Sequence, residues 1–143
     1  MARRLTRQRG VICAAPDYLT RFGIPQTLEE LSQHRCIVGH RRGQPLSWRV
    51  TQAGQTVRYA PPSTHQIGDG EAMILAAVAG TGLCQMPRSL FQDDIQAGRL
   101  MEVLQVHEPE AVDVHAVWPK LSHLRRKVRY VVDELVKLCE HWH

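Results

Sequence analysis

Long hydrophobic runs are absent from this sequence of 143 residues. No apolar run approaches the roughly 20 residues that a helix needs to cross a bilayer, so we predict no membrane partner. The N-terminus has the basic residues of a signal peptide, but the apolar run behind them, residues 11–15, is too short to form its core. With 43% hydrophobic and 22% charged residues, the composition is typical of a soluble globular protein, and we predict a cytoplasmic one.

Paired cysteines and short catalytic motifs are absent as well. The four cysteines lack the spacing of a zinc site and the density of a disulfide scaffold, which predicts small buried side chains at Cys13, Cys36, Cys84 and Cys139. The eight histidines are scattered, and the sequence has no HExxH, GxSxG or P-loop motif. It therefore predicts no metal and no cofactor. A small α/β enzyme that uses a Cys/His pair, with Cys13 or Cys84 as nucleophile, stays open as an alternative.

Negative charge is in the minority, and the formal net charge is +4. The excess is concentrated at two places, Arg3, Arg4, Arg7 and Arg9 near the N-terminus and Arg125, Arg126, Lys127 and Arg129 near the C-terminus. Such runs are usually a solvated face, but a basic DNA-binding module is a second alternative.

A helix-turn-helix is the sharpest form of that alternative. Ala76 and Gly80 have the spacing of a helix and its turn, and another helix begins at Arg88. However, Gly82 and Pro87 would break the recognition helix, and the two aspartates that follow would face DNA phosphates. The sequence therefore argues against this motif.

Residues 67–87 form the centre of the predicted fold. Residues 72–79 are all apolar, which predicts a helix that is covered on nearly all sides. Asp69 caps its N-terminus, and Gly80 and Gly82 end it. Residues 83–86 then form a short strand that Pro87 stops.

Helices and strands alternate along the rest of the chain. Strands are predicted at residues 5–15, 36–38, 100–104 and 112–118, an antiparallel hairpin at 48–50 and 56–59, and helices at 16–22, after a Thr27–Glu30 capping box, at 88–97 and after Ser122. The last helix has apolar residues on one face, at Leu124, Val128, Val131, Val132, Leu135, Leu138 and Cys139. Its basic first turn opposes the helix dipole, which indicates either a solvated end or an acidic neighbour. The pattern predicts an α/β fold with a mixed, mostly parallel sheet.

One segment has the geometry of a ligand site. Gln66 to Gly70 leave a strand and enter a helix, so their backbone amides converge at the carboxyl end of a strand, where open α/β sheets bind ligands. Such amides suit a carboxylate, although Asp69 and Glu71 compete for the same positive field. The alternative is that Asp69 is simply a helix cap.

Short motifs in a fixed order carry a resemblance to a known family. In chain order they are CAAPDYL (13–19), GIP (23–25), LEEL (28–31), HRCI (34–37), WRV (48–50), GDGEA (68–72), GTGL (80–83), MP (86–87), AGRL (97–100), WP (118–119) and LS (121–122), followed by Val128. In this order and spacing the chain resembles the carboxyl-terminal part of the effector-binding domain of LysR-type transcriptional regulators.

The resemblance implies a type 2 periplasmic-binding-protein-like architecture of two α/β lobes joined by two crossing strands, with a small-molecule effector in the cleft. Residues 11–111 would be the second regulatory lobe, and residues 1–10 and 112–143 the hinge strands and a remnant of the first lobe. The amino-terminal winged helix-turn-helix and most of the first lobe would precede Met1, which agrees with a first strand that lacks neighbours. DNA would be bound only through that absent domain.

The resemblance also implies which residues contact the effector. In the family, both lobes contribute residues to the effector cleft. The second lobe's contribution corresponds here to Pro16, Gly39, His40, Gln66, Gly68 and Asp69, with His40 and Gln66 as polar contacts. Effector binding would favour a closed arrangement of the lobes. The exposed apolar stripe of the last helix would promote self-association, by dimerisation or strand exchange.

Overall fold

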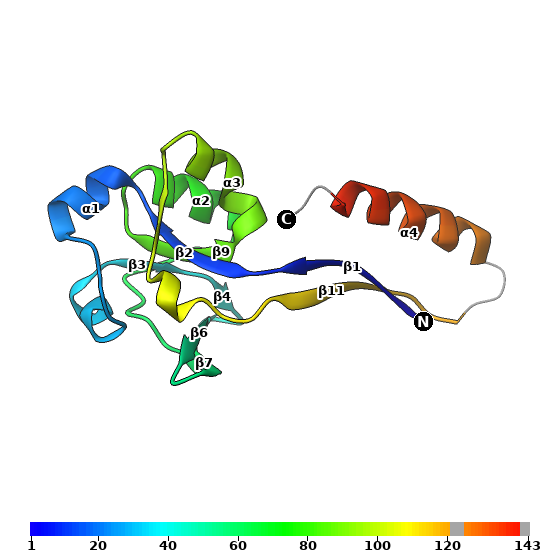
Figure 1. Cartoon of the computed structure of the whole chain (residues 1–143), viewed down its shortest axis with the longest axis horizontal. Helices are drawn as coiled ribbons and strands as arrows, with labels where there is room; N and C mark the ends of the chain where they lie inside the picture. The colour runs from blue at the N-terminus through cyan, green and yellow to red at the C-terminus, as the bar shows by residue number, and fades with distance from the viewer. Residues whose placement is uncertain (121–124, 141–143) are drawn as a thin grey trace. The chain divides into compact units, whose positions relative to one another are not determined.

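A five-stranded sheet organises residues 10–110 of the computed structural model, which describes residues 1–120 and 125–140 (Figure 1). Its order is β10 (Met101–Val103), β2 (Gly10–Ala14), β9 (Leu83–Pro87), β3 (Cys36–Val38) and β8 (His65–Gln66). β3 pairs in parallel with β8 and β9, whereas β2 is antiparallel to β9 and β10. Four of these strands thus point the same way. Because the reversed strand β2 lies inside the sheet and pairs on both sides, only two of the four pairs are parallel, and the sheet is mixed.

Alternation along the strands divides the interior into two cores. Val11 and Cys13 of β2 face one side of the sheet, together with Ile37 and Cys84. Ile12 and Ala14 face the other side, with Cys36, Val38 and Leu83. All of these residues are buried, so successive residues of each strand support opposite layers. The cysteines are therefore small core residues, as predicted.

Helices α2 (Gly70–Val78) and α3 (Arg88–Gln96) cover one face, where Met73, Ala77 and Phe91 are buried. The other face is covered by α1 (Pro16–Phe22), the 3₁₀ helix η1 (Glu29–Gln33) and the hairpin of β6 (Trp48–Gln52) and β7 (Gln55–Tyr59). The expectation that α2 is covered on nearly all sides is wrong, because Leu75 is 65% exposed. The sheet contacts one stripe of the helix, at Met73 and Ala77, and Leu75 lies off that stripe.

Three details of the loops differ from the sequence predictions. The residues after Thr27 form a 3₁₀ helix, in which the Glu30 N–H donates to Thr27 Oγ1 at 3.3 Å. The Glu30 carboxylate accepts from the Gln26 N–H at 2.8 Å, so the capping box closes one residue early. The polar residues after Gly39 form a second hairpin, β4 (His40–Arg41) and β5 (Gln44–Pro45). The 3₁₀ turn η2 (Gln105–His107) follows β10.

Residues 1–9 and 111–143 form a second compact unit, separate from residues 10–110. Strand β1 (Ala2–Gln8) pairs antiparallel with β11 (Val112–Val117), and helix α4 (Arg125–Cys139) contacts β1. The strand expected at residues 5–15 is thus two strands, β1 and β2. Ser122 and Leu124 lie outside the described residues.

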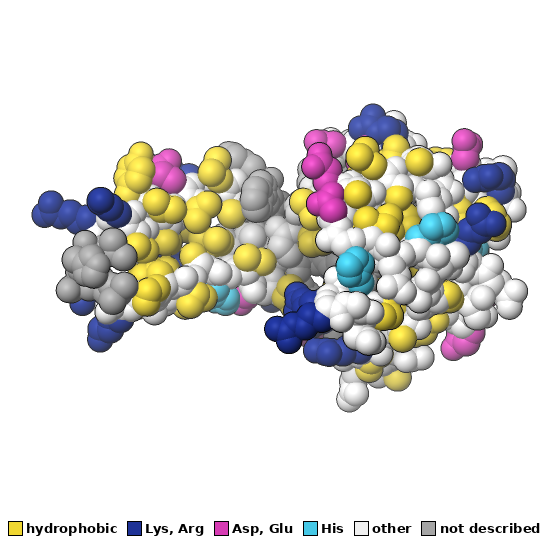
Figure 2. Space-filling view, turned by 180° about the vertical axis from the view of Figure 1, so that it is seen from behind, with side chains coloured by type: hydrophobic (Ala, Val, Ile, Leu, Met, Phe, Trp, Pro, Cys, Tyr) yellow, Lys and Arg dark blue, Asp and Glu magenta, His cyan; other side chains and the backbone are white. Residues whose placement is uncertain are grey.

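Helix α4 leaves half of its apolar residues exposed. Val132 and Cys139 are buried, whereas Val131 is 54% and Leu138 61% exposed. Figure 2 shows hydrophobic side chains gathered over this unit. None of the helices among residues 1–120 and 125–140 is long and apolar enough to span a membrane.

Candidate functional site

The carboxyl ends of β3 and β8 bring two predicted ligand segments together. The strands are parallel, with Val38 opposite Gln66, and the Ile67 N–H donates to the Val38 carbonyl at 3.0 Å. Gly39 and His40 leave one strand beside residues 66–69, which leave the other. Five of the six residues predicted from the family resemblance therefore lie at one edge of the sheet, namely Gly39, His40, Gln66, Gly68 and Asp69.

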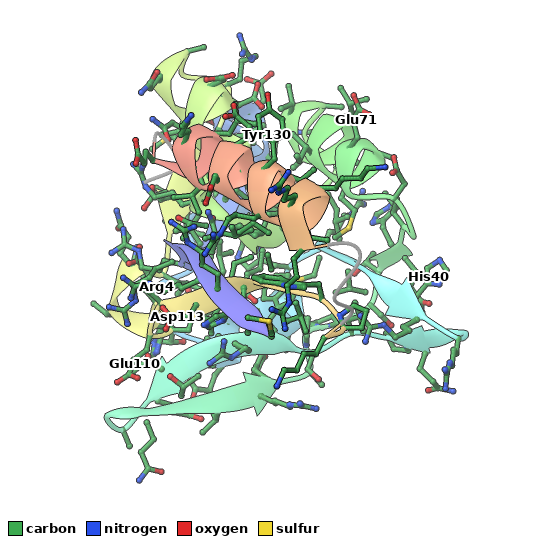
Figure 3. The ribbon with its side chains drawn as sticks, turned by 90° about the vertical axis from the view of Figure 1, so that its right-hand side faces the viewer. Arg4, His40, Glu71, Glu110, Asp113 and Tyr130 are labelled. Carbon is green, nitrogen blue, oxygen red and sulfur yellow. The ribbon has the colours of Figure 1, made fainter. Side chains whose placement is uncertain are left out.

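His40 and Gly68 are in direct contact at this edge. A Cβ atom on Gly68 would lie 2.8 Å from His40 Nε2, closer than real Cβ atoms approach, and 3.2 Å from Cε1. Gly68 is therefore the residue that lets the imidazole lie over its loop. His40 is exposed at the start of β4, where Figure 3 labels it, so the ring is available to a ligand.

Gly39 provides a second close approach. Its carbonyl accepts from the Leu46 N–H at 2.8 Å, which closes the base of the β4–β5 hairpin. A Cβ at Gly39 would lie 3.1 Å from Leu46 Cδ1 and 3.9 Å from Met73 Sδ. Leu46 and Met73 thus give the edge an apolar side next to the polar His40, a combination typical of small-molecule sites.

The N-terminus of α2 adds polar groups. Asp69 caps the helix, since its Oδ2 accepts from the Ala72 N–H at 2.9 Å, as predicted from the sequence. Glu71 lies in the first turn, and Figure 3 labels it there. The first N–H groups of a helix have no intrahelical partner and favour anions. Two carboxylates already occupy this field, so the edge suits a ligand of low negative charge or a hydrogen-bonded acid.

Pro16 lies away from the other five residues. β2 runs against β9, with Gly10 opposite Pro87 and Cys13 opposite Cys84. The carboxyl end of β2, and Pro16 after it, is therefore at the edge where β3 and β9 begin. The residue pattern alone does not indicate the reversed direction of β2.

Because β2 is reversed, residues that the sequence did not indicate lie near the edge of the candidate site. Gly10 is at the β2 end that faces the carboxyl end of β9, and a Cβ at this position would meet the Gln85 side chain at 3.6 Å. Gln85 also holds the β6 backbone, because its amide donates to the Arg49 carbonyl at 2.7 Å and accepts from the Arg49 N–H at 3.0 Å. A Cβ at Gly70 would meet Met86 Cε at 3.4 Å. These contacts support the edge from the side of β9.

The nucleophile candidates do not form a reactive site. Cys13 and Cys84 face each other across β2 and β9, and both are fully buried. Burial raises the pKa of the Cys84 thiol to about 12 and raises the pKa of Cys13 still further. Neither thiol is available as a thiolate near neutral pH. Within residues 1–120 and 125–140, no group of three or more His, Cys, Asp or Glu side chains is placed to hold a metal ion.

The helix-turn-helix alternative is also wrong. Leu83 to Pro87 between α2 and α3 form strand β9, which pairs with both β2 and β3. A recognition motif needs its two helices joined by a short turn. This part of the chain is therefore the centre of a sheet.

Comparison with known proteins identifies relatives over almost the whole chain. Residues 1–140 match the family model described as LysR substrate binding domain. The HTH-type transcriptional regulator YhjC of Escherichia coli (strain K12) is 30% identical over 99% of this chain and 48% of its own length. The HTH-type transcriptional activator TtdR of the same strain is 28% identical, over 98% of this chain and 45% of its own length. The chain spans about half the length of these curated relatives.

Solved structures give the same result. CrgA, a LysR-type transcriptional regulator from Neisseria meningitidis, has a solved structure that aligns with 97% of this chain and 47% of its own chain, at 27% identity and a TM-score of 0.83. The periplasmic-binding-protein-like fold and the resemblance expected from the sequence are both confirmed.

Proposed function

This chain belongs to the LysR substrate binding domain family, and from that membership we propose that it senses a small-molecule effector for a transcription regulator. Residues 11–111 act as one regulatory lobe, and residues 1–10 and 112–143 as hinge strands and part of another. Compact units that divide between Arg9 and Gly10 and between Glu110 and Ala111 support this division.

The effector binds at the edge formed by Gly39, His40, Gln66, Gly68 and Asp69. The observation that carries this proposal is the contact of His40 with Gly68, because it joins loops that leave two neighbouring parallel strands. Ligands of open α/β sheets lie beyond the carboxyl ends of such strands. The effector is a small carboxylic acid, whose oxygens pair with the amides that begin α2 and with His40, and whose apolar part contacts Leu46.

The bound effector controls DNA binding in the whole protein. Relatives of about twice the length are named HTH-type regulators, which supports DNA contact through a helix-turn-helix domain that is not among these 143 residues. A ligand shifts a protein between two arrangements by its differential affinity for them. We place this action in the cytoplasm, where bacterial DNA lies. Among residues 1–120 and 125–140, none supports an enzymatic step.

Self-association is the second part of the proposal. The unit of β1, β11 and α4 exposes several large apolar side chains, Val117 at 76%, Val131 at 54% and Leu138 at 61%. Large apolar side chains exposed on one unit are typical of protein interfaces. Sedimentation equilibrium over a wide range of chain concentration tests this part, and a monomer at all concentrations would contradict it.

The effector site is tested by NMR titration of the ¹⁵N-labelled chain with acetate, succinate and benzoate, each beside its neutral amide. We expect at least one acid to shift the backbone amides of Gly39, Gly68 and Gly70, and the matched amide to bind less tightly. His40→Ala should weaken binding about tenfold, since a hydrogen bond to a charged group contributes on the order of 1.5 kcal/mol or more.

The control is Gln52→Ala at the exposed end of β6, which should leave binding unchanged. Acids that shift no amide at this edge, or an affinity that His40→Ala leaves intact, would overturn the proposed site.

A further inference from the structure

A basic cavity lies within the unit of residues 1–9 and 111–143, apart from the edge described above. Its volume is about 530 Å³, in the range that holds small organic ligands. The N-terminal end of β1, residues that follow β11 and the first turns of α4 line it. Five cationic side chains line it, Arg3, Lys120, Arg125, Arg126 and Arg129.

Positive charge in this cavity is largely uncompensated. Among the described residues that line the cavity, Asp133 is the one carboxylate, and its Oδ1 already pairs with Arg3 Nη1 at 2.5 Å. Over residues 1–120 and 125–140, no ion pair joins Lys120, Arg125, Arg126 or Arg129 to an acid. Clustered like charges repel one another, so an anion that enters the cavity lowers the electrostatic energy of the folded chain.

The start of α4 adds to the same field. Arg125, Arg126 and Lys127 stand in or beside its first turn, where the N-terminal end of a helix is itself positive. The sequence left open whether this end is solvated or has an acidic neighbour. Asp133 is the acidic neighbour that lines the cavity, and it forms its ion pair with Arg3. The guanidinium groups of Arg125 and Arg126 are therefore available to a ligand.

An apolar wall completes the cavity. Trp118 and Val132 line it, and Val132 is buried. The backbone of Trp118 is fixed by two bonds to Met1, one from the Met1 amino group to the Trp118 carbonyl at 2.8 Å and one from the Trp118 N–H to the Met1 carbonyl at 3.0 Å. An indole beside several guanidinium groups suits a ligand with a flat apolar body and an anionic end. Figure 2 shows Lys and Arg side chains at this end of the unit, beside hydrophobic ones.

We propose that this cavity is a second binding site, for an aromatic carboxylate, separate from the effector site in residues 10–110. The carboxylate pairs with Arg125, Arg126 and Arg129, and the aromatic ring packs against Trp118 and Val132. Arginine is suited to this role because its planar guanidinium group binds a carboxylate through two parallel hydrogen bonds.

The test is calorimetric titration of the full chain with 2-naphthoate, followed by ¹H–¹⁵N NMR of the Trp118 indole. We expect 2-naphthoate to bind and to shift the Trp118 Nε1–H signal, and 2-naphthamide and inorganic phosphate to bind at least about tenfold more weakly. The double variant Arg126→Gln/Arg129→Gln should lose about tenfold or more in affinity for 2-naphthoate.

The matched control is Arg41→Gln/Arg42→Gln on the exposed β4–β5 hairpin, which removes the same charge and should leave the affinity unchanged. Thermal unfolding verifies that both double variants are folded. Three outcomes would overturn the proposal. They are equal binding of the acid and its amide, equal binding of phosphate and 2-naphthoate, and equal losses of affinity in the two double variants. Each would show that the ligand does not need the carboxylate, the aromatic ring or the arginines of this cavity, respectively. Shifts at Gly39 and Gly68 without a Trp118 shift would assign the ligand to the effector site instead and overturn this one alone.

Discussion

The imidazole of His40 lies over Gly68, so close that a Cβ at Gly68 would come to 2.8 Å from its Nε2. These residues are 28 positions apart and meet because β3 and β8 are parallel neighbours. The contact places the side chain at the edge of the sheet where the proposed effector site lies. It also makes Gly68 a specific test of that site.

We expect Gly68→Ala to displace the His40 ring without unfolding the chain. The clashing atoms belong to an exposed side chain that can rotate, so the free energy of unfolding should fall by less than about 1 kcal/mol. Carboxylate affinity should fall as in His40→Ala. Urea unfolding and NMR titration measure both effects. In a His40→Ala background the added Gly68→Ala change should have little further effect on affinity, and a full additional loss would show that the glycine acts by another route.

Asp69 has a structural and an electrostatic role that two substitutions separate. Asp69→Ala removes the hydrogen bond to the Ala72 N–H and should lower the free energy of unfolding by about 1 kcal/mol. Asp69→Asn keeps a capping oxygen but removes the charge, so stability should change little while carboxylate binding becomes tighter. Urea unfolding and titration with the same acid provide the comparison. Tighter binding in Asp69→Ala but not in Asp69→Asn would contradict this separation.

The three sheet cysteines should resist modification in the folded chain. Cys13, Cys36 and Cys84 are fully buried, and burial raises the pKa of Cys36 and Cys84 to about 12. In a Cys139→Ser variant, an aromatic disulfide reagent at pH 8 should therefore react only as fast as the chain opens, and rapidly in urea. Fast reaction of one thiol without urea would revive the Cys/His enzyme that the sequence left open.

Local signals predicted most of the elements. Asp69, Gly23 and Gly98 mark helix ends through chemistry that acts within a few residues, and the structure places them at those ends. The unbroken apolar run from Val11 to Ala14 likewise predicts a buried strand, and the structure buries all four residues. The features that the sequence did not predict depend on how distant segments pair and pack. The reversal of β2 separates Pro16 from the other site residues, and the exposure of Leu75 depends on which stripe of α2 meets the sheet.

The proposed effector site likewise combines residues that local sequence signals predict with residues that only the fold brings together. Asp69 and the loop before α2 were indicated by the residues themselves, whereas His40 entered only through the family resemblance. Its place beside Gly68 follows from the pairing of β3 with β8, which no local pattern reports. The basic runs at Arg3 and at Arg125 to Arg129 were visible in the sequence. That they line one cavity follows from the contact between α4 and β1.

Stability should decline on mild acidification because of His34. This side chain is 9% exposed, its Nδ1 lies 2.8 Å from the Tyr18 hydroxyl, and burial lowers its pKa against a smaller opposing effect of Glu30. The unfolded chain therefore takes up a proton near the ordinary histidine pKa of 6.5, before the folded chain does. The contribution of His34 is complete above pH 6.5 and is lost as the pH falls through its lowered folded pKa.

Urea unfolding at pH 7.5 and pH 5.5 measures this effect. The loss of stability between the two should be smaller in His34→Gln than in the parent chain. The exposed His115 on β11 provides the control, and His115→Gln should retain the parent's pH dependence. Identical pH dependence in the parent and His34→Gln would exclude His34 as the source.

An added methyl group at Gly82 should strongly destabilise the fold. This glycine is buried before β9, and its Cβ would lie 2.6 Å from the Arg35 carbonyl oxygen, a backbone atom that cannot rotate away. That same carbonyl accepts from the Leu83 N–H at 2.9 Å, so relief of the clash breaks the first hydrogen bond between β9 and the segment that enters β3. We expect Gly82→Ala to lower the free energy of unfolding by about 3 kcal/mol. Gly10→Ala is the matched control, because its nearest contact would be the Gln85 side chain at 3.6 Å, and it should cost less than about 0.5 kcal/mol. Equal losses in the two variants on urea unfolding would mean that loss of glycine itself, and not the Arg35 carbonyl, sets the penalty.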